Sequence, residues 1–299
     1  MITKKMEFSS KIAKYDNSTE EWSEIITPKG HLFDLRLKEV WRYRDLIFLF
    51  VKRDMASQYR QTILGPLWYL IQPVLTTIMF LIVFNKIAKI PTGHMPPVLF
   101  YMSGIAIWNY FSTCLNNTSA TFVNNAGIFG KVYFPRLAMP LSNILSNVVK
   151  FLIQFGLVLI VYCYYVFTGQ YMPHAEWNVL LIPVIVVTMA ALGLSLGILI
   201  SSLTTKYRDL TILISFGVQL LMYITPVVYP LSFLEQSKYK NLIEWNPLSP
   251  MVESFRYSLF GEGIFNLYFF GYSILFTLII FFIAIVIFSR VERTFMDTV

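Results

Sequence analysis

The chain has 299 residues, of which 56% are hydrophobic, 17% aromatic and only 14% charged, whereas soluble domains carry about 25% charged residues. This composition excludes an ordinary soluble enzyme, and several apolar runs of about 18 residues or more predict an all-α, multi-pass membrane protein. The net charge of +7 does not indicate a nucleic-acid partner, because half of the basic residues precede the first apolar run, as the positive-inside rule expects. The two cysteines and three histidines have no metal-site spacing, so no metal is expected.

The polar N-terminal region divides into two parts, residues 1–36 and residues 37–64. Residues 1–36 lack the apolar core of a signal peptide and are expected to form a cytoplasmic extension. Residues 37–64 predict an amphipathic helix lying on the membrane surface, with basic side chains reaching the anionic headgroups. Its apolar stripe comprises Leu37, Val40, Trp41, Ile47, Val51 and Met55. Gly65 and Pro66 then end the helix. A simple membrane anchor and a docking surface for a cytosolic partner both remain open.

Six spans are predicted within a transmembrane domain at 65–290, followed by a cytoplasmic tail at 291–299. Each span is long enough for the roughly 30 Å hydrocarbon core, which needs about 20 helical residues. The spans are expected at about 66–86, 98–122, 140–167, 178–203, 210–230 and 267–289. Pro226 should kink or end the fifth.

The distribution of lysine and arginine sets the predicted orientation. Basic residues gather before span 1, in loops 2–3 and 4–5, and after span 6, so both termini are expected in the cytoplasm. They are Lys4, Lys5, Lys11, Lys14, Lys29, Arg36, Lys38, Arg42, Arg44, Lys52, Arg53, Arg60, Lys131, Arg136, Lys206, Arg208, Arg290 and Arg293. The loop at 231–266 is then external. Its apolar pieces are too short to span and predict interfacial or re-entrant helices, between which the sequence does not decide.

The internal loop at about 124–136 is short and unusually apolar. Exposed aromatic side chains there would be costly, so something should cover them; the aromatic belt at the membrane interface is one alternative. Its GIFGKV stretch is not a phosphate-binding loop, because Asn125 stands where the first glycine is required and Val132 follows the lysine. ATP binding is therefore expected in a separate chain.

Polar residues within spans are costly and informative. Asn117 and Thr121 share a face of span 2, and Asn143, Asn147 and Lys150 share a face of span 3. Two interpretations are open: hydrogen bonding between helices, or the wall of a hydrated conduit. Lys150 could also reach the interface along its own stem. Three aromatic residues are further conduit candidates, expected either to anchor the aromatic belt or to offer apolar faces to sugar rings: Trp108, Tyr223 and Tyr229.

Several stretches resemble one family. They are IITPKG, LKEVWRYRDLIFLFVKRDMASQYRQTILGPLWYLIQP, GKVYFPRLAMPLSN, YITPVVYP, NPLSPMVESFR and VERTFMDTV. Together they resemble the permease subunits of bacterial polysaccharide ABC exporters, the type-2 class that exports O-antigen, teichoic acid and capsule. The resemblance covers nearly the whole chain from about residue 25.

The resemblance implies a homodimer that works with two copies of a cytosolic ABC ATPase, which binds ATP and Mg, in the bacterial inner membrane. The cargo would be a lipid-linked glycan, and this chain would have no enzymatic activity or cofactor of its own. It assigns ATPase coupling to Gly130, Lys131, Val132, Tyr133, Phe134, Pro135 and Arg136. It places interfacial-helix residues at Trp41, Arg44, Asp45, Arg53, Asp54, Tyr59 and Arg60, and external-loop landmarks at Asn246, Pro247 and Arg256.

Three other functions remain as alternatives. A type-2 exporter of a drug or lipid would share the same architecture. A secondary carrier would need acidic or histidine side chains at mid-membrane, which the six spans lack. A membrane glycosyltransferase is disfavoured, because the chain has no DxD pair and no histidine within a span.

Overall fold

The structure is a computed structural model that describes residues 37–59, 63–129, 134–171, 177–204, 209–234 and 237–294. These residues fall within one compact unit, Leu35–Val299. All regular elements in the described ranges are helices. In chain order they are α2 (Leu37–Arg42), α3 (Arg44–Tyr59), η1 (Gly65–Leu67), α4 (Trp68–Phe80), η2 (Leu81–Ile87), α5 (Pro97–Ser119), α6 (Thr121–Phe129), α7 (Ala138–Phe167), η3 (Trp177–Leu180), α8 (Leu181–Thr204), α9 (Leu210–Ile224), η4 (Leu231–Leu234), α10 (Lys240–Glu244), α11 (Leu248–Phe260) and α12 (Leu267–Thr294).

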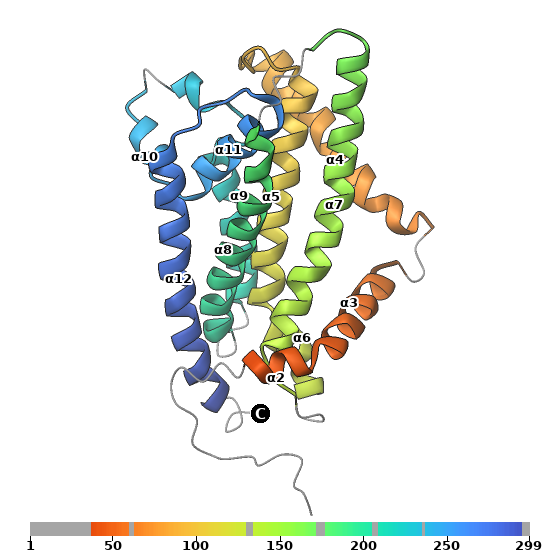
Figure 1. The fold of residues 1–299 in the computed structure, drawn as a ribbon, viewed down its shortest axis with the longest axis vertical. Coiled ribbons are helices and arrows are strands. Elements are labelled where there is room, and N and C mark those ends of the chain that lie inside the picture. The colour runs from red at the N-terminus through yellow and green to blue at the C-terminus, as the bar shows by residue number, and fades with distance from the viewer. Residues whose placement is uncertain are drawn as a thin grey trace, which may run out of the picture. The chain divides into compact units, whose positions relative to one another are not determined.

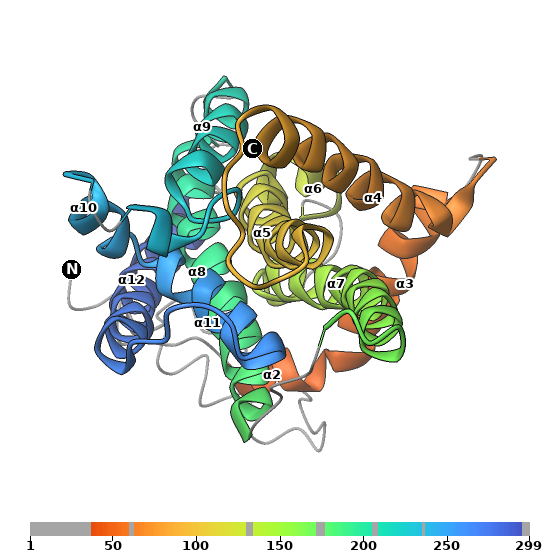
Figure 2. The ribbon, with the colours of Figure 1, turned by 90° about the horizontal axis from the view of Figure 1, so that it is seen from above.

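The long helices run side by side, with short helices at both ends (Figure 1). One end, called the α3 end below, carries α2, α3 and α6 beside the start of α7. The opposite end, called the α11 end, carries α10 and α11. Seen along the bundle, α5 lies among α4, α7, α8, α9 and α11 (Figure 2), and it packs against all five. α5 is therefore the central helix of the bundle.

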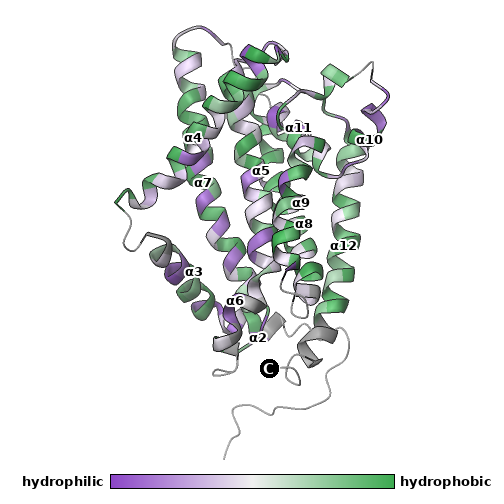
Figure 3. Ribbon diagram, turned by 180° about the vertical axis from the view of Figure 1, so that it is seen from behind, coloured by the Kyte–Doolittle hydropathy of each residue, from purple (hydrophilic) through white to green (hydrophobic). Residues whose placement is uncertain are grey.

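Five helical segments are long and apolar enough to cross a membrane: Gly65–Ile87, Pro97–Ser119, Ala138–Phe167, Asn178–Ser202 and Leu267–Phe288. They confirm five of the six predicted spans. Apart from α5, their apolar surfaces lie largely open, as helices facing lipid require. Figure 3 shows hydrophobic residues over most of α8, α9 and α12, with hydrophilic residues gathered in α3 and in parts of α5 and α7. The chain is an integral membrane protein.

The fifth predicted span is shorter than expected, because the helix stops before Pro226. α9 ends at Ile224, and Thr225 is extended at φ −95° and ψ 142°. A proline ring clashes with a helical conformation of the residue before it, which forces that residue into the extended region. The remaining residues of the predicted span, up to Pro230, form no helix.

Close contact between α5 and α8 depends on two glycines. A Cβ at Gly197 would lie 2.5 Å from Thr118 Cβ, and one at Gly193 would lie 2.9 Å from Cys114 Cβ. Small residues four apart let two membrane helices approach closely and gain van der Waals contact, which replaces the hydrophobic effect as the driving force within lipid. This contact fixes the centre of the bundle.

The 231–266 loop is only partly a surface structure. Nearly every residue of α11 is buried, packed against α5, α8 and α12, whereas α10 keeps exposed side chains such as Leu242. The interpretation of this loop as a surface-lying helix pair is therefore wrong for α11. With 13 residues, α11 is too short to span, and it inserts among the ends of the spans.

Candidate functional site

The predicted interfacial helix consists of two helices, α2 and α3, joined at Tyr43, and one face packs on the chain itself. Val40, Ile47 and Phe50 are buried against Phe134 and the first turn of α7, Ala138 and Met139. The rings of Phe50 and Phe134 lie 5.6 Å apart between centroids. α3 is therefore held by the beginning of span 3 as well as by any membrane surface.

Val40 and Ile47 of the predicted apolar stripe are buried against the chain itself, whereas Trp41 of the same stripe is exposed. The Trp41 side chain is 71% exposed, and Phe50 takes the buried position instead. A second apolar group, which includes Phe48 and Leu49, is exposed on the same helix pair. The apolar residues of this segment thus divide into an inward set and an outward set, whereas a single stripe was predicted.

The basic residues of α3 are exposed while Asp54 is half-buried, and two of the arginines pair with the aspartate next to them. Arg53 Nη2 lies 2.8 Å from Asp54 Oδ1, and the guanidinium is 4.9 Å from the Phe50 ring. Arg44 pairs at 3.8 Å with Asp45 and lies over the Trp41 ring. Exposed pairs of this kind contribute little stability, at most about 1 kcal/mol. Their charges therefore remain available to headgroups or to a partner. The Tyr59 side chain and Arg60 lie outside the described residues.

The structure describes only the last part of the predicted coupling segment. Gly130, Lys131, Val132 and Tyr133 lie outside the described residues, while Phe134 and Arg136 are buried and Pro135 is half-buried. The expectation that something covers the aromatic side chains is met at Phe134, and the cover is Phe50 of α3. α3, Phe134 and the start of α7 thus form one packed unit at the C-terminal end of this segment.

Four of the predicted conduit residues bond to one another. Asn117 Nδ2 donates to Asn147 Oδ1 at 3.2 Å, and Asn143 Nδ2 donates to Thr121 Oγ1 at 2.9 Å. Asn147 also donates to Cys114 Sγ at 3.8 Å. Asn147 of α7 and Thr121, the first residue of α6, are almost fully buried. Their geometry favours the first of the two open interpretations, an interhelical hydrogen-bond cluster, over a wall open to water.

The remaining conduit candidates are scattered. Lys150 Nζ lies 5.5 Å above the Tyr69 ring of α4, a cation–π contact within the bundle. Trp108 is buried beside Phe111 in the core. Tyr223 is about half exposed at the end of α9, where its carbonyl accepts the Tyr229 hydroxyl at 3.1 Å. These residues do not converge on one surface.

A polar stripe on α5 was missed from the sequence. Asn109, Ser112, Thr113 and Asn116 are partly exposed, although most of α5 is buried. They recur at i, i+3, i+4 and i+7 and therefore share one helix face. That face is opposite Cys114 and Thr118, the residues that contact α8. The same spacing test that selected Asn143 and Asn147 could have found it, had every polar residue of 97–119 been placed on the helix.

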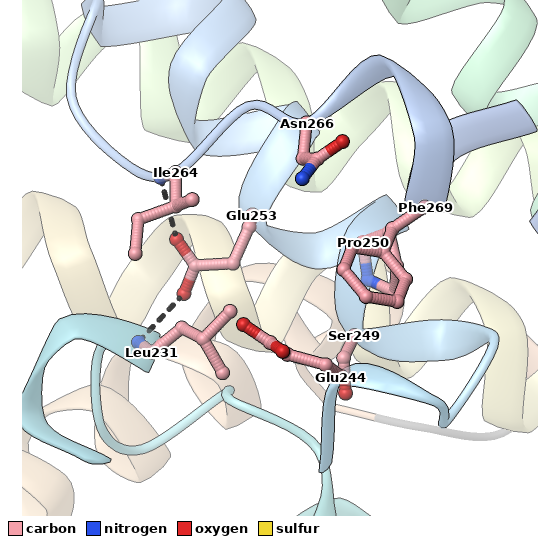
Figure 4. A pocket seen from close by; sticks show the side chains of 8 residues that line it. All are labelled: Leu231, Glu244, Ser249, Pro250, Glu253, Ile264, Asn266 and Phe269. Atoms are coloured by element: carbon pink, nitrogen blue, oxygen red, sulfur yellow. Dashed lines mark hydrogen bonds between the residues drawn. The ribbon is translucent and has the colours of Figure 1, made fainter. Parts of the chain in front are cut away.

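The landmarks of the external loop do come together, at the end of α9. Asn246 Nδ2 donates to Thr225 Oγ1 at 3.0 Å, and Asn246 Oδ1 accepts the Leu248 N–H at 3.1 Å. Pro247 precedes the first residue of α11. Arg256 is buried beneath them and forms an ion pair with Glu253. Glu253, which the sequence did not single out, also lines a small cavity of about 30 Å³ with Glu244 and Ser249 (Figure 4).

Known proteins resemble this chain over most of its length. Residues 45–260 match the family described as ABC-2 type transporter. The chain belongs to the ABC-2 type transporter family. An O-antigen export system permease protein RfbA of Klebsiella pneumoniae is 26% identical over 253 residues, 85% of this chain and 94% of the relative. An RfbA of Myxococcus xanthus is 27% identical over 221 residues, 74% of this chain and 82% of the relative.

A third relative is more distant. The polysialic acid transport protein KpsM of Escherichia coli is 21% identical over 254 residues, 82% of this chain and 93% of the relative. The family match begins at Asp45 and ends at Phe260, so it includes nearly all of α3 and the whole of α11. Membership of the ABC-2 family implies an ATP-hydrolysing partner for this chain.

Proposed function

We propose that this ABC-2 chain is the permease subunit of an ATP-driven exporter that moves a lipid-linked polysaccharide, of the O-antigen, teichoic-acid or capsule kind, across the bacterial cytoplasmic membrane. The observation that carries the proposal is the similarity to O-antigen permeases over most of both chains. Both termini are cytoplasmic in this proposal, so that the α3 end faces the cytoplasm and the α11 end faces outward.

The transporter is a homodimer whose conduit is completed by the second copy. The polar stripe of α5 supports this arrangement, because its four residues stay partly exposed within one chain although α5 is otherwise mostly buried. A polar face on a membrane helix is unstable against lipid. A second copy that presents the same stripe would enclose a polar passage, and the α5–α7 asparagine cluster would stiffen its wall.

Two copies of an ABC ATPase bind at the α3 end and hold the ATP and Mg. Residues 130–136 receive the movement of the ATPase and pass it to the α3–α7 unit. The contact between Phe50 and Phe134 supports this route, since it joins the residue that follows the undescribed 130–133 stretch to α3. A displacement of the segment would therefore move α3 and span 3 together.

Co-purification and export together test the function. A tagged chain should bring down an ABC ATPase, and a strain that lacks the chain should accumulate lipid-linked glycan inside while losing it from the surface. Purified chain that moves cargo alone, driven by an ion gradient, would refute the proposal. So would surface glycan that is unchanged in the deletion strain.

Thiol labelling tests the conduit. In a Cys163→Ser background, Asn109→Cys and Thr113→Cys should react with a charged, membrane-impermeant thiol reagent, because thiolates form in water. Leu152→Cys is the matched control, since Leu152 is exposed on α7 with no polar neighbours at i±3. Equal labelling of all three positions, or none at Asn109 and Thr113, would contradict the conduit assignment.

A further inference from the structure

Glu253 and Arg256 of α11 are a buried ion pair, with both side chains about 1–2% exposed and Oε1 3.3 Å from Nη1. Removing two charges from water costs more than their mutual attraction returns unless further hydrogen bonds satisfy both groups. Each charge in this pair has such bonds, and most of them go to backbone atoms. The pair therefore cannot be understood from its two side chains alone.

Arg256 binds the backbone where α9 has stopped. Nη1 donates to Pro226 O at 2.6 Å and Nη2 donates to Val227 O at 2.7 Å. The guanidinium also lies 3.8 Å from the centroid of the Phe100 ring of α5. Carbonyls just beyond a helix end have no intrahelical donor, so Arg256 supplies the donors that the interrupted span lacks.

Glu253 binds backbone groups of the opposite polarity. Its Oε1 accepts the Leu231 N–H at 3.2 Å, at the start of η4, and its Oε2 accepts the Ile264 N–H at 3.5 Å, shortly before α12. Figure 4 shows both contacts with the carboxylate. The guanidinium thus faces carbonyls and the carboxylate faces amides, and neither charge can take the other's place.

Two glycines make room for the pair. A Cβ at Gly104 of α5 would lie 2.6 Å from Arg256 Nη2, and one at Gly263 would lie 3.1 Å from Glu253 Oε2. Gly263 also has φ +122°, a conformation that only glycine adopts without strain. The surrounding backbone is therefore shaped around both charged groups.

We propose that Glu253 and Arg256 form a polarity-specific clamp that joins the end of α9, α11 and the approach to α12 into one moving unit. The two residues are positioning residues that keep these three segments in step when the α11 end opens. Their role in export rests on the proposed function, whereas the mechanical coupling of the three segments does not.

Hydrogen–deuterium exchange of the purified chain tests the coupling. Glu253→Gln and Arg256→Gln should each speed exchange in both segments, 226–231 and 262–266, by more than about tenfold, because each removes a hydrogen bond to a charged group. Glu244→Gln is the matched control, since its pair with Lys240 on α10 is partly exposed at 3.7 Å; it should leave both segments unchanged. Faster exchange only in the segment that the altered residue touches would overturn the proposal.

A charge exchange separates polarity from simple attraction. The double variant Glu253→Arg, Arg256→Glu keeps an ion pair but sets each charge against backbone groups of its own sign, so it should restore neither slow exchange nor export. Recovery in this variant would refute the clamp. With the ATPase partner present, the single variants should hydrolyse ATP while exporting less, a split that general unfolding would not give.

Gly104→Ala tests the same coupling without altering a polar group. Its Cβ displaces the guanidinium, so both segments should again exchange faster. If Gly104→Ala and both Gln variants all fail to accumulate in cells, the pair supports the whole fold. That result would overturn the proposal of a local coupling. If the variants bind the ATPase normally and exchange faster in both segments but export at the usual rate, only the role of the pair in export is overturned.

Discussion

Replacing Phe50 by alanine should release α3 from α7. Phe50 is 5% exposed and its ring is 5.6 Å from that of Phe134. Truncating a buried phenylalanine costs roughly 3–5 kcal/mol. The lower end applies here, because the released helix can still place apolar side chains in lipid. About 3 kcal/mol corresponds to a shift of roughly a hundredfold in the docking equilibrium of α3.

Limited trypsin digestion measures this equilibrium. Lys52 and Arg53 lie on the exposed side of α3, and cleavage there requires local opening, so its rate follows the undocked population. The rate should rise about a hundredfold in Phe50→Ala, as the equilibrium shift requires. Phe48→Ala is the control, because Phe48 is on the same helix but 57% exposed, and it should change the rate by less than about threefold.

The pairwise contact can be isolated with a second substitution. In a double-mutant cycle, Phe50→Ala and Phe134→Ala should couple by about 1 kcal/mol, the usual value for a tilted aromatic pair. Similar cleavage rates in Phe50→Ala and Phe48→Ala, or additive effects of the two inward substitutions, would show that α3 is held by the membrane alone and would refute the packed α3–α7 unit.

Three further predictions concern stability in detergent, measured by thermal unfolding. Asn147→Ala should cost about 1–2 kcal/mol, because it removes the interhelical contacts to Asn117 and Cys114 and takes the hydrogen-bond acceptor from the half-buried Asn117 amide. Gly197→Ala should destabilise the protein, since its Cβ would collide with α5, whereas Gly217→Ala, with no atom within 4 Å of its Cβ, should be neutral or slightly stabilising; the reverse order would contradict the α5–α8 packing. Burial raises the pKa of Tyr171 to about 12, above its usual value of about 10, so its hydroxyl stays protonated and its bond to the Phe260 carbonyl is lost only as the pH rises through about 12. Tyr171→Phe should therefore lower the free energy of unfolding by about 1 kcal/mol, and by the same amount at pH 6 as at pH 9. A loss of stability that differs between these two pH values would contradict this prediction.

Much of the fold could be predicted, because lipid imposes strong rules. Long apolar runs must be helices, so five spans were placed within a few residues, and Pro226 was correctly expected to end or kink the fifth. Packing against the chain itself was harder. Trp41 and Phe50 are both apolar, and the choice of which one faces inward depends on Phe134, a residue 84 positions from Phe50.

The candidate site was predicted less well, for a related reason. A polar side chain in a span can bond to a neighbouring helix or face water, and its residue type does not distinguish the two. Asn147 has partners on α5, while Thr113 stays partly exposed among the described helices. Glu253 was missed because its charge was counted as part of an external loop, and only the fold shows that this charge is buried.

The short fifth span has a mechanical consequence. At 1.5 Å per residue, the 15 residues of α9 measure about 22 Å, against roughly 30 Å of hydrocarbon. The missing stretch is an irregular backbone kept from lipid by α11 and supplied with hydrogen bonds by side chains. Because Arg256 binds the carbonyls of Pro226 and Val227, a movement of α11 would reach α9 through hydrogen bonds to a broken backbone and not along a continuous helix.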